Sequence, residues 1–116
     1  KYEKLLDKKF LYLPNIKKHS QSSFHLYVIK LKDKYNFLHE KLFNFLRQRG
    51  LNVNLHYIPV HLHPHYRKFG FKTGIFKNSE KHAKSSISIP IYPNLKEKNV
   101  IKISKLINNF FYRNEK

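Results

Sequence analysis

The chain has 116 residues, of which 41% are hydrophobic and 16% aromatic, and its formal net charge is +17. One domain with a modest core is expected at this length, and the apolar content argues against intrinsic disorder despite the charge. There is no cysteine, which excludes disulfides, thiolate metal sites and cysteine nucleophiles, and no apolar run approaches the roughly 20 residues that span a bilayer.

The first part of the chain is predicted to hold the end of a helix, a polar connector and a strand. Residues 1–13 have the pattern of a helix tail that ends at Pro14, and residues 15–23 are polar. The segment FHLYVIKL, residues 24–31, is rich in β-branched and aromatic residues. This composition is typical of a strand that is covered on much of both faces.

The middle of the chain is predicted to form an amphipathic helix followed by a second strand. Apolar residues follow helical spacing over residues 34–49. Asp33 is placed to cap the start of this helix, and Gly50 is placed where a glycine commonly ends one. The next segment, LNVNLHY at residues 51–57, alternates apolar and polar residues, as a half-buried strand does.

The last part of the chain is predicted to hold two short helical segments, a third strand and a final helix. HPHYRKFG is expected to form a helical turn that ends at Gly70, residues 70–77 a loop, and NSEKHAKS a short helix capped by Asn78 or Ser79. SISIP, residues 86–90, has the pattern of a strand.

The final helix is predicted from a capping signal and an apolar stripe. Asn94 and Glu97 have the spacing of a capping box. The stripe that follows is Leu95, Val100, Ile103, Leu106 or Ile107, and Phe110. The whole order predicts an α+β domain, with a small three-stranded sheet packed with helices.

Four histidines occur in the stretch HYIPVHLHPHY, at positions 56, 61, 63 and 65. A metal site would ordinarily include carboxylates or use them to support its histidines, and there are only 7 Asp and Glu residues in the chain. A catalytic histidine needs a nucleophile and an orienting partner, and none is evident in the pattern. We therefore expect no metal ligand and no catalytic residue. Packing within a loop and contact with a ligand both stay open for these rings.

Several motifs, in order and with matching spacing, resemble the C-terminal domain of the DegT–StrS family, the sugar-nucleotide aminotransferases of fold type I that use pyridoxal 5'-phosphate (PLP). The family pattern has Ser-Ser-aromatic-His-Leu-Tyr before a strand, Gly-Ile/Leu ending a helix, and His-Tyr-x-Pro-x-His with a tyrosine soon after. It continues with a Glu that opens a short helix, and with Leu/Ile-Ser-Ile/Leu-Pro-x-x-Pro before the last helix. The matching residues are Ser22 to Tyr27, Gly50, His56 to His61 with Tyr66, Glu80, and Ile87 to Pro93. Within the family, the chain looks most similar to transaminases that act on UDP-4-keto-6-deoxy-HexNAc sugars of the pseudaminic acid type.

The resemblance implies the activity of a whole enzyme of which this chain is one part. Such an enzyme moves an amino group from glutamate to a keto carbon of a nucleotide-linked sugar, in surface polysaccharide or glycan biosynthesis, through a lysine Schiff base with PLP. The segment that carries this lysine is missing from the sequence. We expect residues 1–19 to be the end of an interdomain helix and a connector, and residues 20–116 to be the small domain. Alone it should bind no PLP and be inactive.

The resemblance also implies site residues and an oligomeric state. His61 takes the place of a family histidine that lies beside the nucleotide-sugar, and Tyr57 and His56 are nearby candidates for substrate contact; His63 and His65 fall where the family varies. The intact enzyme is expected to be a homodimer, while the absence of cysteine and of a long apolar run favours a cytoplasmic protein with no membrane partner.

A different reading is a free-standing basic module that binds nucleic acid or another polyanion. The charge of +17 favours such binding, but only four of the 24 basic residues are Arg, the residue that reads phosphates and bases in a bidentate way. The lysines are scattered along the chain, as on a solvated surface, and the abundance of Lys, Asn, Ile, Phe and Tyr is typical of an A/T-rich genome. We therefore expect no dedicated nucleic-acid partner.

Overall fold

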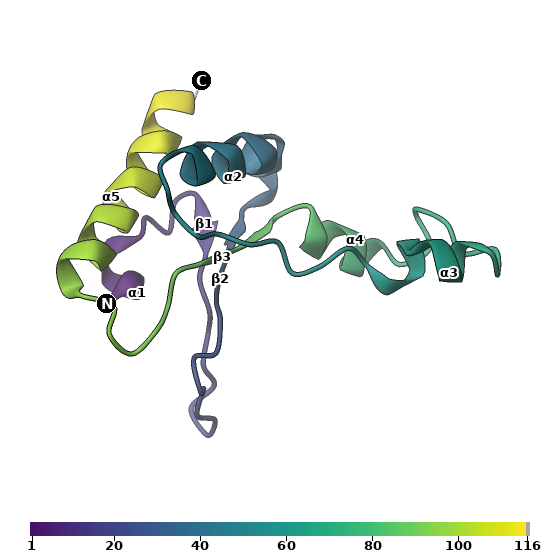
Figure 1. The fold of residues 1–116 in the computed structure, drawn as a ribbon, viewed down its shortest axis with the longest axis horizontal. Helices are drawn as coiled ribbons and strands as arrows, with labels where there is room; N and C mark the ends of the chain where they lie inside the picture. Colours follow the sequence, from purple (N-terminus) through teal and green to yellow (C-terminus); the bar gives the residue numbers. More distant parts are fainter. Residues whose placement is uncertain (116) are drawn as a thin grey trace.

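The computed structural model describes residues 1–115, which form a compact core and two projections (Figure 1). The elements run α1 (Tyr2–Leu5), β1 (Leu11–Tyr12), β2 (Tyr27–Leu31), the 3-10 helix η1 (Asp33–Leu38), α2 (His39–Gln48), the 3-10 turn η2 (Val60–Leu62), α3 (Pro64–Arg67), α4 (Lys77–Ala83), β3 (Ser86–Ile89) and α5 (Glu97–Asn114). The predicted α+β class is confirmed.

The three strands form one antiparallel sheet in the order β1-β2-β3. Tyr27 pairs with Ile89, and Leu11 pairs with Leu31. The predicted number of strands is therefore correct, but one of the three strands was misplaced. Residues 51–57 make only an isolated bridge, between Asn54 and Ser88, and the third strand is instead β1, which lies in the segment predicted as helix.

The helix predicted over residues 1–13 is confined to α1 because the chain turns to bury Phe10 and Leu11. Phe10 is fully buried and stacks on Phe111 of α5, with ring centroids 4.9 Å apart. Asn108 of α5 closes the end of α1, since its amide nitrogen donates to the Leu5 carbonyl and its amide oxygen accepts from the Asp7 N–H, at 2.8 and 3.1 Å. Packing against α5 thus overrides the local helical pattern. The domain boundary at residue 20 stays a prediction.

The helix predicted over residues 34–49 is present, but its first turns differ. Residues 33–38 form η1 rather than α-helix, and Asp33 makes no capping hydrogen bond. At the other end, Gly50 has φ +75°, its N–H donates to Arg47, and the Leu51 N–H donates to Leu46, at 2.9 and 3.1 Å. This pair of hydrogen bonds is the Schellman ending that a glycine makes possible.

The remaining predicted elements occur with shifted starts. β2 begins at Tyr27 rather than at residue 24, and α4 and α5 start without the predicted side-chain caps. Glu97 instead forms an ion pair with Lys1, at 2.9 Å. The helical turn at α3, the loop after Gly70 and the strand β3 agree with the sequence pattern.

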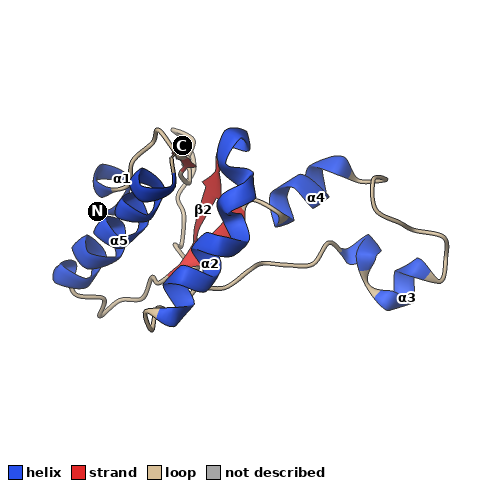
Figure 2. Ribbon diagram, turned by 90° about the horizontal axis from the view of Figure 1, so that it is seen from above, coloured by secondary structure: helices blue, strands red, loops and turns tan. Residues whose placement is uncertain are grey.

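The core lies between the sheet, α2 and α5 (Figures 1 and 2). The predicted stripe of α5 is confirmed at Val100, Ile103, Ile107 and Phe110, whereas Leu106 is half-buried and Leu95, also half-buried, lies before the helix. The buried hydrophobic residues are Tyr2, Leu6, Phe10, Leu11, Tyr27, Ile29, Leu31, Tyr35, Leu38, Leu42, Leu46, Val53, Ile87, Ile89, Val100, Ile103, Ile107, Phe110 and Phe111. All of them lie outside the two projections.

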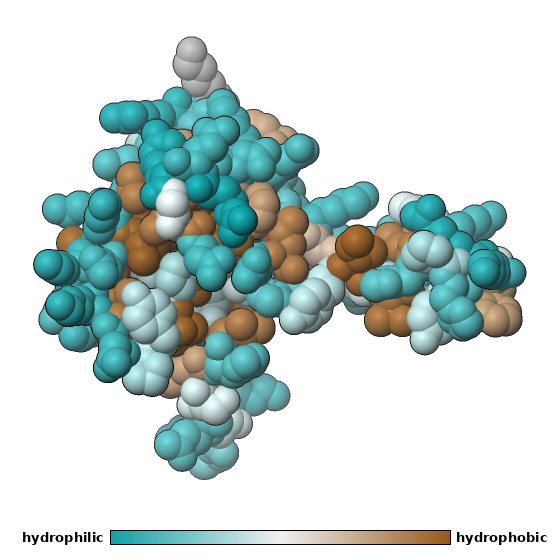
Figure 3. Space-filling model, viewed as in Figure 1, coloured by the Kyte–Doolittle hydropathy of each residue, from teal (hydrophilic) through white to brown (hydrophobic). Residues whose placement is uncertain are grey.

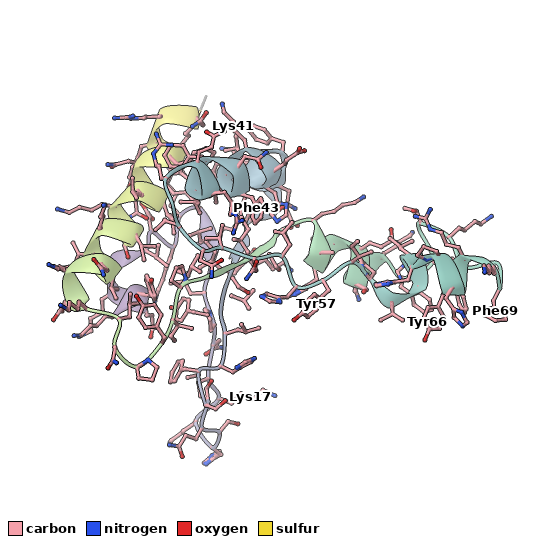
Figure 4. The ribbon with its side chains drawn as sticks, viewed as in Figure 1. Lys17, Lys41, Phe43, Tyr57, Tyr66 and Phe69 are labelled. Atoms are coloured by element: carbon pink, nitrogen blue, oxygen red, sulfur yellow. The ribbon has the colours of Figure 1, made fainter. Side chains whose placement is uncertain are left out.

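Two segments project from this core. The loop of residues 13–26 joins β1 to β2 and carries Lys17 towards its far end (Figure 4). The second projection, residues 55–84, is called the arm; it leaves the core after α2, carries η2, α3 and α4, and returns to β3 (Figures 1 and 2). The arm contains all four clustered histidines and therefore holds the candidate site.

Candidate functional site

The arm is built without an apolar core of its own. Its only buried side chains are those of His61 and Glu80, each 7% exposed. Large apolar side chains are instead displayed on its surface, as the brown patches among hydrophilic residues show (Figure 3). The exposed members are Leu55, Tyr57, Ile58, Val60, Tyr66, Phe69, Ile75 and Phe76.

A hydrogen-bonded cluster around Glu80 joins three parts of the arm. His61 Nε2 lies 2.9 Å from Glu80 Oε1, which links η2 to α4. The Gly74 N–H donates to both carboxylate oxygens, at 2.8 and 3.0 Å, which adds the intervening loop. The ring of Phe76 meets that of His61 edge-on, with centroids 4.9 Å apart. These contacts fix the position of the His61 ring.

The hydrogen bonds to Glu80 also determine its charge. The hydrogen bond from His61, helped by that from the Gly74 N–H, holds the pKa of the Glu80 carboxyl below its ordinary value, although burial acts in the opposite direction. Glu80 is therefore ionised at neutral pH and can only accept hydrogen bonds.

His56 occupies a polar recess at the foot of the arm. Both of its ring nitrogens are buried and have no hydrogen-bond partner within residues 1–115, and the same holds for Ser88 Oγ on β3. The two side chains line a hollow of about 210 Å³ together with His25, Asn54 and Tyr92, among others. Because buried polar groups are ordinarily paired, the recess offers these atoms to a small polar partner.

The structure separates the three residues predicted to contact substrate. His56 and Tyr57 are adjacent, with ring centroids 4.6 Å apart, and Tyr57 is 73% exposed near the root of the arm (Figure 4). His61 makes its hydrogen bond with Glu80 and with neither of these two. Their roles towards a ligand stay predictions.

The other two histidines of the stretch have separate local contacts. His63 Nε2 lies 3.1 Å from the Ile58 carbonyl oxygen. His65 packs against the rings of Tyr66 and Phe69. Neither takes part in the cluster around Glu80.

The sequence analysis matched Glu80 to a family motif but gave it no role in the site, although a signal for such a role was present. It is the only acidic residue between Glu40 and Glu97, in a segment that holds the histidine cluster. A single carboxylate among imidazoles is the natural acceptor for one of them. Spacing in the sequence could not predict which histidine donates to Glu80, because the irregular loop between His61 and Glu80 brings the two together.

The lysines of the described residues lie mostly at the surface. A lysine that forms a Schiff base is ordinarily sheltered, with an acidic or basic partner for the pyridine nitrogen of the cofactor. Within residues 1–115, every lysine is exposed except Lys30 and Lys32, which are half-buried. The same residues contain no group of three or more His, Asp or Glu side chains that could hold a metal ion, and no helix among them is both long and apolar enough to cross a membrane.

Comparison with known proteins places this arrangement in a family. The chain is 36% identical to the uncharacterized protein MJ1066 of Methanocaldococcus jannaschii over 106 residues, which are 90% of the chain and 28% of that protein. It is 33% identical over 89 residues, 75% of the chain, to a UDP-4-amino-4,6-dideoxy-N-acetyl-beta-L-altrosamine transaminase of Campylobacter jejuni, of which it covers 23%. The chain thus spans about a quarter of the length of these curated relatives.

A solved structure shares the fold. Helicobacter pylori PseC, described as an aminotransferase involved in the biosynthesis of pseudoaminic acid, superposes with a TM-score of 0.85 at 25% identity over 97% of this chain and 30% of its own. The family described as DegT/DnrJ/EryC1/StrS aminotransferases matches residues 2–108, from α1 through the arm and into α5. The chain therefore belongs to the DegT/DnrJ/EryC1/StrS aminotransferase family.

Proposed function

We propose that this chain is the small C-terminal domain of a PLP-dependent aminotransferase. The whole enzyme transfers an amino group from glutamate to a keto carbon of a nucleotide-linked sugar, in the synthesis of a surface polysaccharide or glycan. Family membership supports the reaction class. The names of the transaminase from C. jejuni and of PseC from H. pylori support an amino-sugar product.

The observation that carries the proposal is the arm. Outside the core, it displays exposed apolar side chains together with the cations Arg67, Lys68, Lys72, Lys77, Lys81 and Lys84, while its single acid, Glu80, is buried. Such a surface suits contact with further protein and with an anionic ligand. In the proposal the arm forms one wall of a site that also needs the larger part of the enzyme.

PLP belongs to that larger part under this proposal. The cofactor supplies the electron sink and the imine chemistry of amino transfer, and its lysine lies outside this chain. The chain's contribution is to line the nucleotide-sugar with His61, Tyr57 and His56. The intact enzyme is proposed to act as a homodimer.

The experiment compares the 116-residue chain with the full-length protein. We expect amino transfer from glutamate to a UDP-4-keto-6-deoxy-HexNAc sugar by the full-length protein, and none by the chain alone with excess PLP. Bound PLP is followed by its visible absorbance. A PLP absorbance band in the isolated chain, or the absence of transfer by the full-length protein, would contradict the proposal.

A substitution tests the proposed substrate contact. In the full-length enzyme, His61→Ala should raise the KM for the nucleotide-sugar with a smaller effect on kcat, because a contact made in the ground state is lost. His63→Ala is the matched control, since His63 bonds only to the Ile58 carbonyl and should leave both constants unchanged. Unchanged kinetics for His61→Ala would remove it from the site.

A further inference from the structure

The buried pair of His61 and Glu80 is an unusual way to hold a projecting segment. Burying a carboxylate is costly, and an ion pair in place of apolar packing is often neutral or unfavourable for stability. An apolar pair would therefore hold the arm at least as well. What the polar pair adds is a defined orientation and a defined proton position for the His61 ring.

The proton position follows from the acceptors. The ionised Glu80 carboxylate accepts from the Gly74 N–H at both oxygens and can donate to nothing. The His61 nitrogen that lies 2.9 Å from Glu80 Oε1 is Nε2, so Nε2 must carry a hydrogen. In the neutral ring the lone pair is then on Nδ1.

The second nitrogen of His61 is available to a ligand. Nδ1 has no hydrogen-bond partner within residues 1–115, since the only side-chain hydrogen bond of His61 is that of Nε2. Unlike the two ring nitrogens of His56, Nδ1 of His61 is not one of the fully buried polar atoms that lack a partner. Nδ1 of His61, on a side chain that is 7% exposed, is therefore left free to accept a hydrogen bond at the edge of the cluster.

We propose that Glu80 is a positioning residue that holds His61 as the Nε2–H tautomer, so that Nδ1 accepts a hydrogen bond from a hydroxyl group of the bound ligand. The ligand class rests on the proposed function, where the donor is a hydroxyl of the sugar. A phosphate oxygen cannot fill this role, because it has no hydrogen to donate to a bare nitrogen. In this tautomer Nδ1 thus faces a hydroxyl of the sugar and not the pyrophosphate.

The first experiment measures the tautomer of the His61 ring in the 116-residue chain. Nitrogen-15 NMR at about pH 8, where a free imidazole is neutral, reports which ring nitrogen of His61 carries hydrogen. We expect a protonated Nε2 and a bare Nδ1. In Glu80→Ala the two nitrogen shifts should move towards each other as both tautomers are sampled, and Glu80→Gln, which keeps an accepting oxygen, should restore the first pattern.

Glu97→Gln removes an exposed carboxylate of the core that pairs with Lys1, and it should leave His61 unchanged. Amide signals of β2 show that each variant is folded. A hydrogen on Nδ1 in the unmodified chain, whether alone or with one on Nε2, would overturn the proposal. So would an unchanged His61 pattern in Glu80→Ala, or an averaged one in Glu80→Gln.

The second experiment uses the full-length enzyme and separates this proposal from the proposed function. Glu80→Ala and His61→Ala should each raise the KM for the nucleotide-sugar about tenfold, the effect of losing one hydrogen bond. The double variant should be no worse than either single one, because both remove the same contact. Additive effects would overturn the coupling. If neither variant changes KM while the tautomer is as expected, Glu80 positions His61 but His61 does not touch the substrate, and that part of the proposed function fails.

Discussion

In the core, the fully buried rings of Phe10 and Phe111 stack at 4.9 Å, whereas in the arm the buried contact is a 2.9 Å hydrogen bond between His61 and Glu80. The first kind of contact gains free energy from every Å² of apolar surface removed from water and tolerates many geometries. The second gains little net free energy but fixes direction and proton position. The core therefore stabilises the fold, and the arm presents a shaped surface.

The largest effect should come from the core. Phe111→Ala removes a fully buried ring that packs against Phe10, Tyr35 and Phe110, and it should lower the free energy of unfolding by about 3–5 kcal/mol. Phe69→Ala, at a ring that is 69% exposed on the arm, should change it by less than about 0.5 kcal/mol. Urea unfolding measures both, and similar losses for the two variants would break the contrast between core and arm.

Two glycines, one in the core and one in the arm, allow a second comparison of stability effects, with smaller expected values. Gly50 and Gly70 have φ of +75° and +87°, and no atom lies within 4 Å of an added Cβ at either position, so an alanine would be strained by its backbone alone. Gly50→Ala should lower the free energy of unfolding by about 1 kcal/mol, because Gly50 ends the core helix α2. Gly70→Ala should leave the urea midpoint unchanged, since it affects only the arm. Equal shifts would show that core and arm unfold as one unit.

How far the sequence predicts the molecule also differs between the two regions. Apolar spacing located α2 and α5, and the positive φ of Gly50 agrees with its predicted place. Apolar spacing did not predict β1. The reason is that Phe10 packs against α5 through a long-range contact, and local periodicity carries no information about such contacts. In the arm, the motif resemblance indicated His61 as a site residue but did not predict its contact with Glu80. That contact depends on the path of the loop between them, which includes the hydrogen bonds from the Gly74 amide to Glu80.

Acid should loosen the arm before it unfolds the core. The folded-state pKa of Glu80 lies below its ordinary value, chiefly because of the hydrogen bond from His61. The stabilisation is therefore present above the unfolded-state pKa, near 4.5, and is lost as pH falls through the lower folded-state value. The amide NMR signal of Gly74 should titrate in that range, while β2 amides stay in place. A Gly74 signal that does not move down to the pH of global unfolding would contradict this prediction, and Glu80→Gln, which cannot titrate, is the control.

The smallest effect concerns the one ion pair that ties the arm to the core among the described residues. Lys81 Nζ of α4 lies 2.6 Å from Asp33 Oδ2 of η1, and the two side chains are 49% and 62% exposed. Exposed pairs of this kind add little to stability because water and salt screen them. Lys81→Ala should therefore leave the urea midpoint unchanged, and it should leave the NMR signals of His61 and Gly74 in place. A shift of those signals would mean that the pair helps to set the arm on the core, so that the arm's geometry would no longer be fixed by Glu80 alone.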